Sequence, residues 1–354
     1  MFRPTQEKPS SSPLPGRTEL VRLGTDDPRW LDFVATRPDA TPLHQPAWTA
    51  FLARCYSFTA FVLALEDGAM LKAGIPVIEA RTPLGSRRWI SLPFSDECGP
   101  IGDSWAELVD AVDSARRAEG VSSHEIRASL PTGFQQTRGV VHRLALASDL
   151  DAVVRNYRSS VRQGIRVASR EGVVVRRADS PDDLTHRFYA MHVATRRRLG
   201  VPVQRRRYFS LLWERLMKTG NGFLLLAERA GVPLAGGVFL QSNGIVVYKY
   251  GASDATHWRL RANTALFHEA ISQSLDAGCH TFDWGRTDTE DEGLRRFKAG
   301  WGSTESELVY STLGTQGGRN LGSDHFAGLA RGVIRRSPKS VSRLAGALLY
   351  RYAA

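Results

Sequence analysis

Arginines recur at intervals of three or four residues between positions 155 and 170. On a continuous helix this spacing places the guanidinium groups along one face, where like charges repel each other. Two interpretations are open: a solvated helix face, or a track that binds the phosphates of RNA or of a nucleotide-linked sugar. The fixed register favours the phosphate track, and short arginine runs follow at 196–198 and 205–207. The candidate phosphate-binding residues are Arg158, Arg162, Arg166 and Arg197.

A second set of polar side chains lies at the end of a short apolar strand, predicted at 280–284. Asp283 interrupts this strand. Because a buried carboxylate without a partner is costly, Asp283 is either a polar anchor for a neighbouring loop or part of a substrate site, and the anchor is favoured. Arg286 follows the strand end, where open α/β sheets place ligands. It binds a phosphate or carboxylate there, or it pairs with Asp288 or Glu290.

The segment 290–300 is predicted to form a helix. Leu294, Phe297 and Trp301 share one face of this helix and are expected to pack inward. Lys298 lies about 100° around the helix from Phe297. Its amine is therefore expected to point toward a cleft, and the alternative is a solvated surface lysine.

A strand is predicted at 245–250, where side chains alternate between the two faces. Tyr248 and Tyr250 are expected on one face and Lys249 on the other. One face lines a cleft, or the tyrosines belong to the core and the lysine to the surface. The sequence leaves both arrangements open.

The composition is that of a folded chain of about two domains. The 354 residues are 42% hydrophobic and 23% charged, and the net charge of +11 favours phosphate-rich partners. Three widely separated cysteines build no disulfide framework, and the histidines lack metal-ligand spacing, so no metal site is expected. No segment approaches the roughly 18 apolar residues that span a bilayer, which predicts a cytoplasmic protein.

Four regions follow from the order of predicted elements. They are a disordered tail at 1–18, an α/β module at 19–149, a second α/β module at 150–312 and a basic helical tail at 313–354. A continuous helix is predicted at 150–170. Three antiparallel strands between 223 and 250, a helix at 264–277, a strand and a final helix complete the second module. The basic tail is a candidate for peripheral contact with the inner membrane face.

Several motifs in the second module, in this order, resemble those of the FemAB/FemX-like transferases within the GNAT superfamily. They are Lys249-Tyr250-Gly251-Ala252-Ser253, Ala262-Asn263, Phe282-Asp283-Trp284-Gly285-Arg286 and the segment 292–302, and the resemblance is clearest over 155–308. It implies an α/β fold with a mixed sheet, built from two tandem GNAT-like modules. It also implies transfer of an aminoacyl group from charged tRNA to an amine of a peptidoglycan or other cell-envelope precursor, with no permanently bound cofactor.

The same resemblance assigns roles to individual residues. Lys298, in the Phe297-Lys298 pair, is expected to stabilise negative charge during transfer, because a fixed cation near the reacting carbonyl lowers the barrier. Asp283 is the second catalytic candidate. Residues 259–264 occupy the place of the turn that holds pyrophosphate in coenzyme-A-dependent relatives, although Ala262 and Thr264 replace its small-residue positions. The candidate substrate-binding residues are Phe297, Tyr248, Lys249, Tyr250, Arg259, Asn263 and Arg286.

Two alternatives remain beside the aminoacyl-tRNA enzyme. The first is an acyl-CoA-dependent N-acyltransferase that acts in exopolysaccharide or envelope biosynthesis. The second is a basic adaptor without catalysis that binds nucleic acid or a membrane surface. If the protein is an enzyme, its acyl donor is therefore charged tRNA or acyl-CoA. If it is the adaptor, it has no acyl donor.

Overall fold

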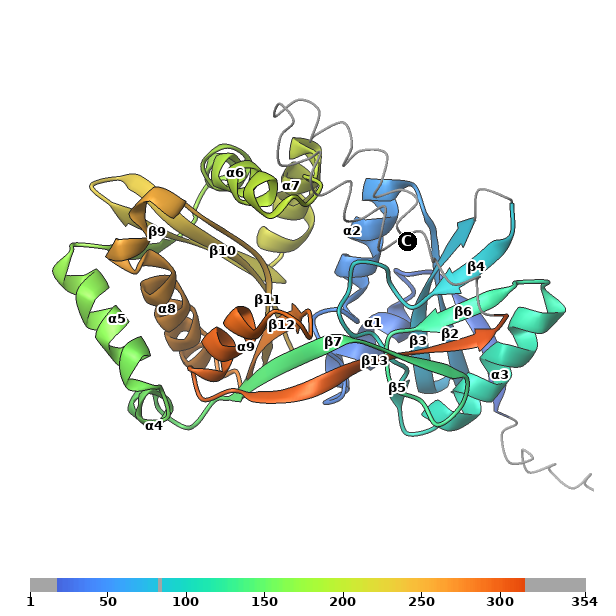
Figure 1. Ribbon diagram of the computed structural model, residues 1–354. Coiled ribbons are helices and arrows are strands. Elements are labelled where there is room, and N and C mark those ends of the chain that lie inside the picture. The colour runs from blue at the N-terminus through green and yellow to red at the C-terminus, as the bar shows by residue number, and fades with distance from the viewer. Residues whose placement is uncertain (1–17, 82–84, 316–354) are drawn as a thin grey trace, which may run out of the picture.

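The computed structural model describes residues 18–81 and 85–315. Residues 316–354, which hold nearly all of the predicted basic helical tail, and residues 1–17 of the predicted N-terminal tail lie outside the described ranges. Across those ranges, no helix is long and apolar enough to cross a membrane. The described part of the chain forms two α/β halves on one shared sheet (Figure 1).

The N-terminal half contains short strands and three helices, much as the apolar pattern predicts. Its elements are β1 (Glu19–Leu23), α1 (Pro28–Thr36), α2 (Pro46–Tyr56), β2 (Thr59–Asp67), β3 (Met70–Arg81), β4 (Arg87–Ile90), β5 (Ile101–Gly102), α3 (Trp105–Ala118) and β6 (Ser123–Ile126). Helix α3 buries Leu108, Val109 and Val112 against this half's sheet, on the side that the 3.6-residue spacing indicates.

The C-terminal half follows the predicted order of helices, antiparallel strands, helix, strand and helix. Its elements are β7 (Phe134–Ala145), α4 (Leu150–Arg155), α5 (Ser159–Arg170), β8 (Val174–Arg177), η1 (Asp183–Phe188), α6 (Tyr189–Leu199), α7 (Arg206–Leu212), η2 (Trp213–Met217), β9 (Gly222–Arg229), β10 (Val232–Ser242), β11 (Ile245–Ser253), η3 (Ala255–Leu260), α8 (Ala262–Asp276), β12 (Thr281–Thr287), α9 (Glu292–Ala299) and β13 (Thr304–Gly314).

The two halves are joined through β7 and β13, which run side by side between them in Figure 1. The strand order is β1-β2-β3-β4-β6-β13-β7-β12-β11-β10-β9-β8, with β5 paired to β3. Strand β7 pairs with β12 in the C-terminal half, whereas the end of β13 pairs with β6 in the N-terminal half. The boundary between modules at 149/150 stays a prediction, and strand pairing crosses it in both directions.

Each half contains one parallel strand pair with a helix in the connection. Strands β4 and β6 are parallel, and α3 lies between them in sequence. Strands β11 and β12 are parallel, and α8 lies between them. The remaining strand pairs of the described sheet are antiparallel, so these two β–α–β units mark equivalent places in the two halves.

The predicted continuous helix at 150–170 is wrong. Helix α4 ends at Arg155, and α5 begins only at Ser159, with Arg158 in an extended conformation before it. Between them the Tyr157 ring is buried against Trp301, at a centroid distance of 4.9 Å, and the Arg158 amide donates to the Gly300 carbonyl. Tertiary packing therefore interrupts the helix, and Arg155 and Arg158 do not share the face of α5.

Candidate active site

Strands β11 and β12 separate after a short parallel contact. Their pairing covers only three residue pairs, from Ile245 with Thr281 to Val247 with Asp283. Beyond that point the two strands no longer pair with each other. Strand β11 stays paired with β10 alone, and β12 stays paired with β7 alone. Helix α8 starts beside this divergence, and its first turn forms one wall of a pocket.

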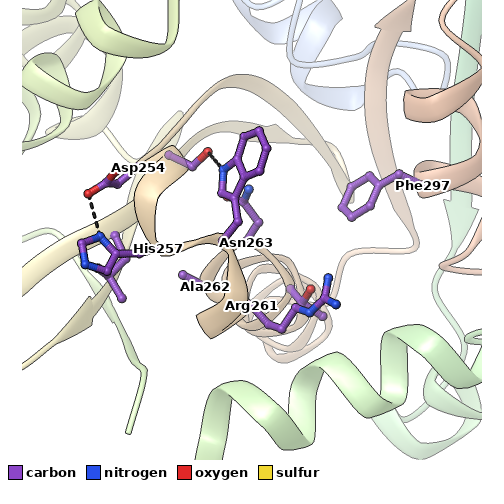
Figure 2. A pocket seen from close by; sticks show the side chains of 10 residues that line it. Asp254, His257, Arg261, Ala262, Asn263 and Phe297 are labelled. Atoms are coloured by element: carbon purple, nitrogen blue, oxygen red, sulfur yellow. Dashed lines mark hydrogen bonds and ion pairs between the residues drawn. The ribbon is translucent and has the colours of Figure 1, made fainter. Parts of the chain in front are cut away.

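The pocket has a volume of about 210 Å³ and is lined by residues of β10, β11, η3, α8 and α9. The start of α8 contributes Ala262, Asn263 and Thr264, and the segment before α8 contributes Arg261. Figure 2 shows Phe297 of α9 on the opposite side of this pocket from Asp254 and His257. The first N–H groups of a helix have no carbonyl partner within the helix, and they carry the positive end of its dipole. With Arg261 beside them, the pocket is suited to an anion such as a phosphate.

Phe297 and Asn263 therefore lie at the predicted site, whereas Arg259 does not line this pocket. Arg259 belongs to η3 and is exposed, and Arg261 takes the lining position in its place. Arg261 has a φ of +56°, in the left-handed region. This conformation turns the chain from η3 directly into α8.

The end of β12 carries a β-bulge, which was not among the predicted features. Its pairing with β7 shifts between Asp283 and Arg286, which leaves the backbone of Trp284 and Gly285 outside the regular ladder. The Nζ of Lys298 donates to the carbonyls of Trp284 at 2.8 Å, Gly285 at 2.7 Å and Arg286 at 3.3 Å. The lysine thus satisfies the carbonyls that the bulge removes from the sheet.

The expected orientation of Lys298 is wrong. Lys298 is only 2% exposed and is the buried residue of α9, whereas Leu294, expected to pack inward, is 38% exposed. Trp301 is buried as predicted. Burial lowers the pKa of Lys298 to about 8, against the opposing effect of Asp96 and Asp283. Because the amine is directed at three backbone carbonyls, it positions the bulge and does not face the pocket.

Two carboxylates lie near this bulge. Asp283 Oδ1 accepts from the Gly285 amide at 2.7 Å, and its Oδ2 accepts from Arg143 Nε at 3.2 Å. Asp96, from the N-terminal half, accepts from the Arg286 amide at 3.3 Å. Asp283 thus has the anchoring contacts favoured from the sequence, and a second acid from the other half stands beside it.

The pKa values of the two carboxyl groups shift in opposite directions. Burial raises the pKa of Asp283, and the nearby Arg143 only partly offsets this effect. Burial also acts to raise the pKa of Asp96, but the positive charge of Lys249, with smaller contributions from other groups, lowers it below its ordinary value. A pair of acids whose pKa values diverge can divide the tasks of binding charge and accepting a proton.

The loop that carries Asp96 is held by contacts from both halves. Leu92 and Phe94 have φ values of 58° and 63°, which side-chain-bearing residues adopt only where surrounding contacts enforce them. The Phe94 carbonyl accepts from Lys249 Nζ at 2.6 Å, and Trp48 Nε1 donates to Ser95 Oγ at 2.8 Å. Lys249 therefore contacts the loop of Asp96 and not the pocket.

The expectation that Tyr248 and Tyr250 share one face is also wrong. Opposite the consecutive residues Val238 and Phe239, β11 pairs through Tyr250 and Tyr248 and skips Lys249, which forms a bulge. Tyr248 packs in the core of the C-terminal half beside Phe239 and Phe267, whereas Tyr250 belongs to the cluster around Tyr208. Tyr250 and Tyr208 hydroxyl oxygens lie 2.5 Å apart. A bulge inverts the alternation on which the expectation rested.

The candidate phosphate-binding arginines are spread over several elements. Arg158 precedes α5 and is exposed, Arg166 is exposed on α5, and Arg197 lies partly exposed in the last turn of α6. Arg162 is less available, because its guanidinium donates to the backbone carbonyls of Arg155 and Tyr157. Arg286 pairs with Asp288 at 2.7 Å, as one of its two interpretations expected.

Sequence reasoning missed Asp96, Arg261 and the bulge at Trp284-Gly285. Asp96 lies in a loop of the other half, so no spacing within one module connects it with Asp283. A signal for the bulge did exist, because Gly285 follows Asp283 within the strand and a glycine in a strand often marks a bulge. Gly285 has a φ of +66°, and a Cβ there would lie 3.0 Å from Asp96 Oδ2.

Residues 155–299, which contain the pocket and the bulge, match the family described as "Acetyltransferase (GNAT) domain". This segment is a GNAT-type acetyltransferase domain. Among solved structures, the whole chain is similar to FemX, with 15% identity, a TM-score of 0.68 and coverage of 82% of this chain and 96% of FemX. The predicted FemX-like α/β fold is confirmed. No curated protein matches the sequence.

Two further solved structures share the fold of this chain. One is the C-terminal domain of a putative lysylphosphatidylglycerol synthetase from Agrobacterium fabrum, with 14% identity, a TM-score of 0.55 and coverage of 86% of this chain and 95% of that one. The other is a tandem GNAT protein of the clavulanic acid pathway, with 12% identity, a TM-score of 0.50 and coverage of 85% and 100%. The prediction of two tandem GNAT-like modules is thereby confirmed, and an enzyme is favoured over the non-catalytic adaptor.

Proposed function

We propose that this acyltransferase moves an aminoacyl group from charged tRNA to an amine of a cell-envelope precursor in the cytoplasm. The observation that carries the proposal is the pocket at the start of α8, where helix N–H groups and Arg261 are arranged for an anionic donor. The similarity to FemX and to a lysylphosphatidylglycerol synthetase domain supports an envelope precursor as acceptor.

The donor end of charged tRNA enters this pocket, and its backbone continues along the basic surface beside it. Helix α5 crosses the first turn of α8 closely, because a Cβ on Gly164 would lie 3.1 Å from Thr264 Cγ2. Arg166 and Arg158 are exposed on and just before α5. Several arginines next to one phosphate pocket favour a donor with many phosphates over a small nucleotide.

The acceptor amine binds at the two carboxylates near the bulge. Asp96, ionised at neutral pH, attracts the ammonium form of the amine. The ammonium first releases one proton to solvent. Asp283, whose raised pKa makes it the stronger base of the two, then accepts the second proton as the neutral amine attacks the carbonyl, and the ribose oxygen of the tRNA takes up a proton as its ester bond breaks. Phe297 lines the donor pocket and contacts Trp284, which follows Asp283 in β12, with ring centroids 6.1 Å apart. In this arrangement Lys298 acts as a positioning residue.

An acyl-CoA donor is the second candidate. The same helix terminus and Arg261 suit a pyrophosphate, and the tandem GNAT protein of the clavulanic acid pathway, in a structure without AcCoA, is associated with that donor. Ala262 and Thr264 at the small-residue positions of the turn favour tRNA over coenzyme A.

A donor assay separates the two candidates. The purified chain is incubated with charged tRNA or with acyl-CoA and a panel of amine acceptors, including lipid-linked and nucleotide-linked precursors. The proposal expects acyl transfer from charged tRNA that ribonuclease abolishes. Transfer that releases free thiol from acyl-CoA and resists ribonuclease would instead identify the second candidate.

The basic surface has its own test. Replacing Arg158, Arg162 and Arg166 by Gln should weaken tRNA binding and flatten the dependence of its affinity on salt, because fewer counterions are released. Replacing Arg54, Arg81 and Arg117, which are exposed in the N-terminal half, removes the same charge as a control. Equal weakening in both variants would show that only the net charge matters.

A further inference from the structure

Trp258 is the most exposed tryptophan of the chain. Of the eight tryptophans, six are buried, Trp105 is 37% exposed and Trp258 is 55% exposed. An indole ring left in water forgoes the stabilisation that burial of so large an apolar surface provides. An exposed tryptophan at the edge of a pocket is therefore a candidate for contact with a ligand.

Trp258 lies in η3 and lines the same pocket as the first turn of α8. Its Nε1 donates to Ser253 Oγ at 3.4 Å, which fixes the ring relative to β11. The Arg198 guanidinium at the end of α6 lies 4.9 Å from the ring centroid. The pocket thus combines a held aromatic ring, a guanidinium against that ring and an anion-binding helix terminus.

We propose that Trp258 is a stacking platform for the adenine base of the acyl donor. The inference rests on the proposed function, because charged tRNA and acyl-CoA both carry an adenosine next to a phosphate. Stacking on an aromatic ring requires only the flat face of a base. The helix terminus and Arg261 hold the phosphate, Trp258 holds the base, and Arg198 contributes positive charge and support to the ring.

This assignment gives η3 a role that the phosphate contacts do not cover. A pocket that binds only phosphate accepts inorganic phosphate, sugar phosphates and nucleotides alike. A platform 55% exposed beside it adds affinity only for ligands with a base. The chain therefore distinguishes a nucleotide-borne acyl group from other phosphorylated molecules through Trp258.

The test uses adenosine 3′,5′-bisphosphate, which contains the adenosine 5′-phosphate common to both donors, and ribose 5-phosphate, which lacks the base. Binding of the bisphosphate to the full chain is expected to quench tryptophan emission. In Trp258→Leu the bisphosphate should bind about tenfold more weakly and the quenching should disappear. Trp258→Phe should keep the affinity within a factor of about three, because it keeps an aromatic face, and should also lose the quenching.

The matched control is Trp105→Phe, which changes the other exposed tryptophan, at the start of α3, and should keep both affinity and quenching. Ribose 5-phosphate should bind equally weakly to the wild type and to Trp258→Leu. The proposal is overturned if Trp258→Leu binds the bisphosphate as tightly as the wild type does. It is also overturned if the substitution weakens both ligands equally, since the ring would then only support the pocket.

Competition separates the source of the adenosine. Uncharged tRNA and coenzyme A are each added to displace the bisphosphate from the wild type and from Trp258→Leu. The donor that binds more weakly to Trp258→Leu than to the wild type is the one that stacks on Trp258. If both donors bind equally well to the two proteins, the stacking proposal is overturned. If the wild type transfers acyl groups and Trp258→Leu does so with an unchanged donor KM, only the platform fails. If the wild type transfers from neither donor, the proposed function itself fails.

Discussion

The two β–α–β units of the molecule share an architecture but differ in the residues at the start of their helices. Helix α3, between β4 and β6, begins beside Asp103 and carries Glu107 in its first turn. Helix α8, between β11 and β12, has no acid in its first turn and follows Arg261. Acids at a helix N-terminus neutralise the dipole there, whereas a basic first turn leaves it available for an anion.

The strand ends of the two units differ as well. After β4 the chain leaves its own half, and the loop that follows places Asp96 beside the bulge of β12. After β12 the chain stays in its half and forms that bulge around Lys298. The two halves are therefore specialised. The C-terminal unit forms the pocket proposed for the donor, and the N-terminal unit places an acid beside the bulge of the C-terminal unit.

The largest effect is expected at Asp283, the acid of the C-terminal unit that lies near Asp96 of the N-terminal unit. Asp283→Asn should lower kcat by at least about 100-fold, because removal of a general base typically costs that much. The rate of the wild type should rise with pH through the raised pKa of Asp283, since only the ionised carboxylate accepts the proton. Steady-state kinetics across pH would measure both effects.

The matched control is Asp288→Asn, an exposed acid at the same strand end that pairs with Arg286. It should keep kcat within a factor of about three. If Asp283→Asn and Asp288→Asn behaved alike, Asp283 would be an anchor only.

The next largest effect concerns the bulge that distinguishes β12. Lys298→Met should lower the free energy of unfolding by about 2–4 kcal/mol, because buried carbonyls of residues 284–286 lose their donor. Urea denaturation at pH 7 would measure the loss. If Lys298→Met were as stable as the wild type, Lys298 would not be needed to hold the bulge.

The difference in unfolding free energy between the wild type and Lys298→Met should depend on pH in a defined direction. Burial lowers the pKa of Lys298 to about 8 in the folded chain, from 10.5 in a solvated lysine. Between these values the unfolded chain binds a proton that the folded chain has released, so the free energy of unfolding of the wild type rises with pH. The neutral amine still donates hydrogen bonds. The stability gap to Lys298→Met should therefore widen from pH 8 to pH 10.

A smaller effect is expected when an acid is introduced into the first turn of α8, to match Glu107 in the first turn of α3. Asn263→Asp should raise the KM for the donor about tenfold, because the carboxylate repels the donor phosphates in the pocket. It should leave the thermal stability unchanged or slightly higher, since an acid suits a helix N-terminus. Asn263→Ala is the control, and an equal rise in KM for both variants would argue against an anionic donor here.

The smallest effect is expected in the N-terminal unit. Glu107→Gln at the exposed start of α3 should lower the free energy of unfolding by a few tenths of a kcal/mol and leave donor KM unchanged. Thermal melts and the same kinetic assay would measure it. A changed donor KM would mean that the donor also contacts the N-terminal unit.

The elements with a clear apolar period could be predicted from the sequence. Helices α3, α8 and α9 and strands β9 to β12 lie close to their predicted positions, because apolar residues mark each element and turn residues mark the breaks between them. Strands β7 and β13 escaped prediction. Their exposed residues at Phe134–Thr137 and Thr304–Glu307 give no apolar alternation, since each strand runs from one half into the other.

The candidate site was predicted less completely, for a physical reason in each case. Phe297 and Asn263 reach the pocket because both lie at regular positions of α9 and α8. Tyr250 and Lys298 were misplaced because bulges in β11 and β12 change which way side chains and carbonyls point. Asp96 comes from the other half, and such long-range pairing has no local signature.

The position of β13 has a consequence for how the protein is made. This strand lies between β7 and β6, yet it is the last described strand to be synthesised. Until it emerges from the ribosome, both of its neighbours present open edges that can pair with other chains. Neither half completes its sheet before that moment, so the two halves mature together. A nascent chain that stops before residue 304 should therefore be prone to aggregation.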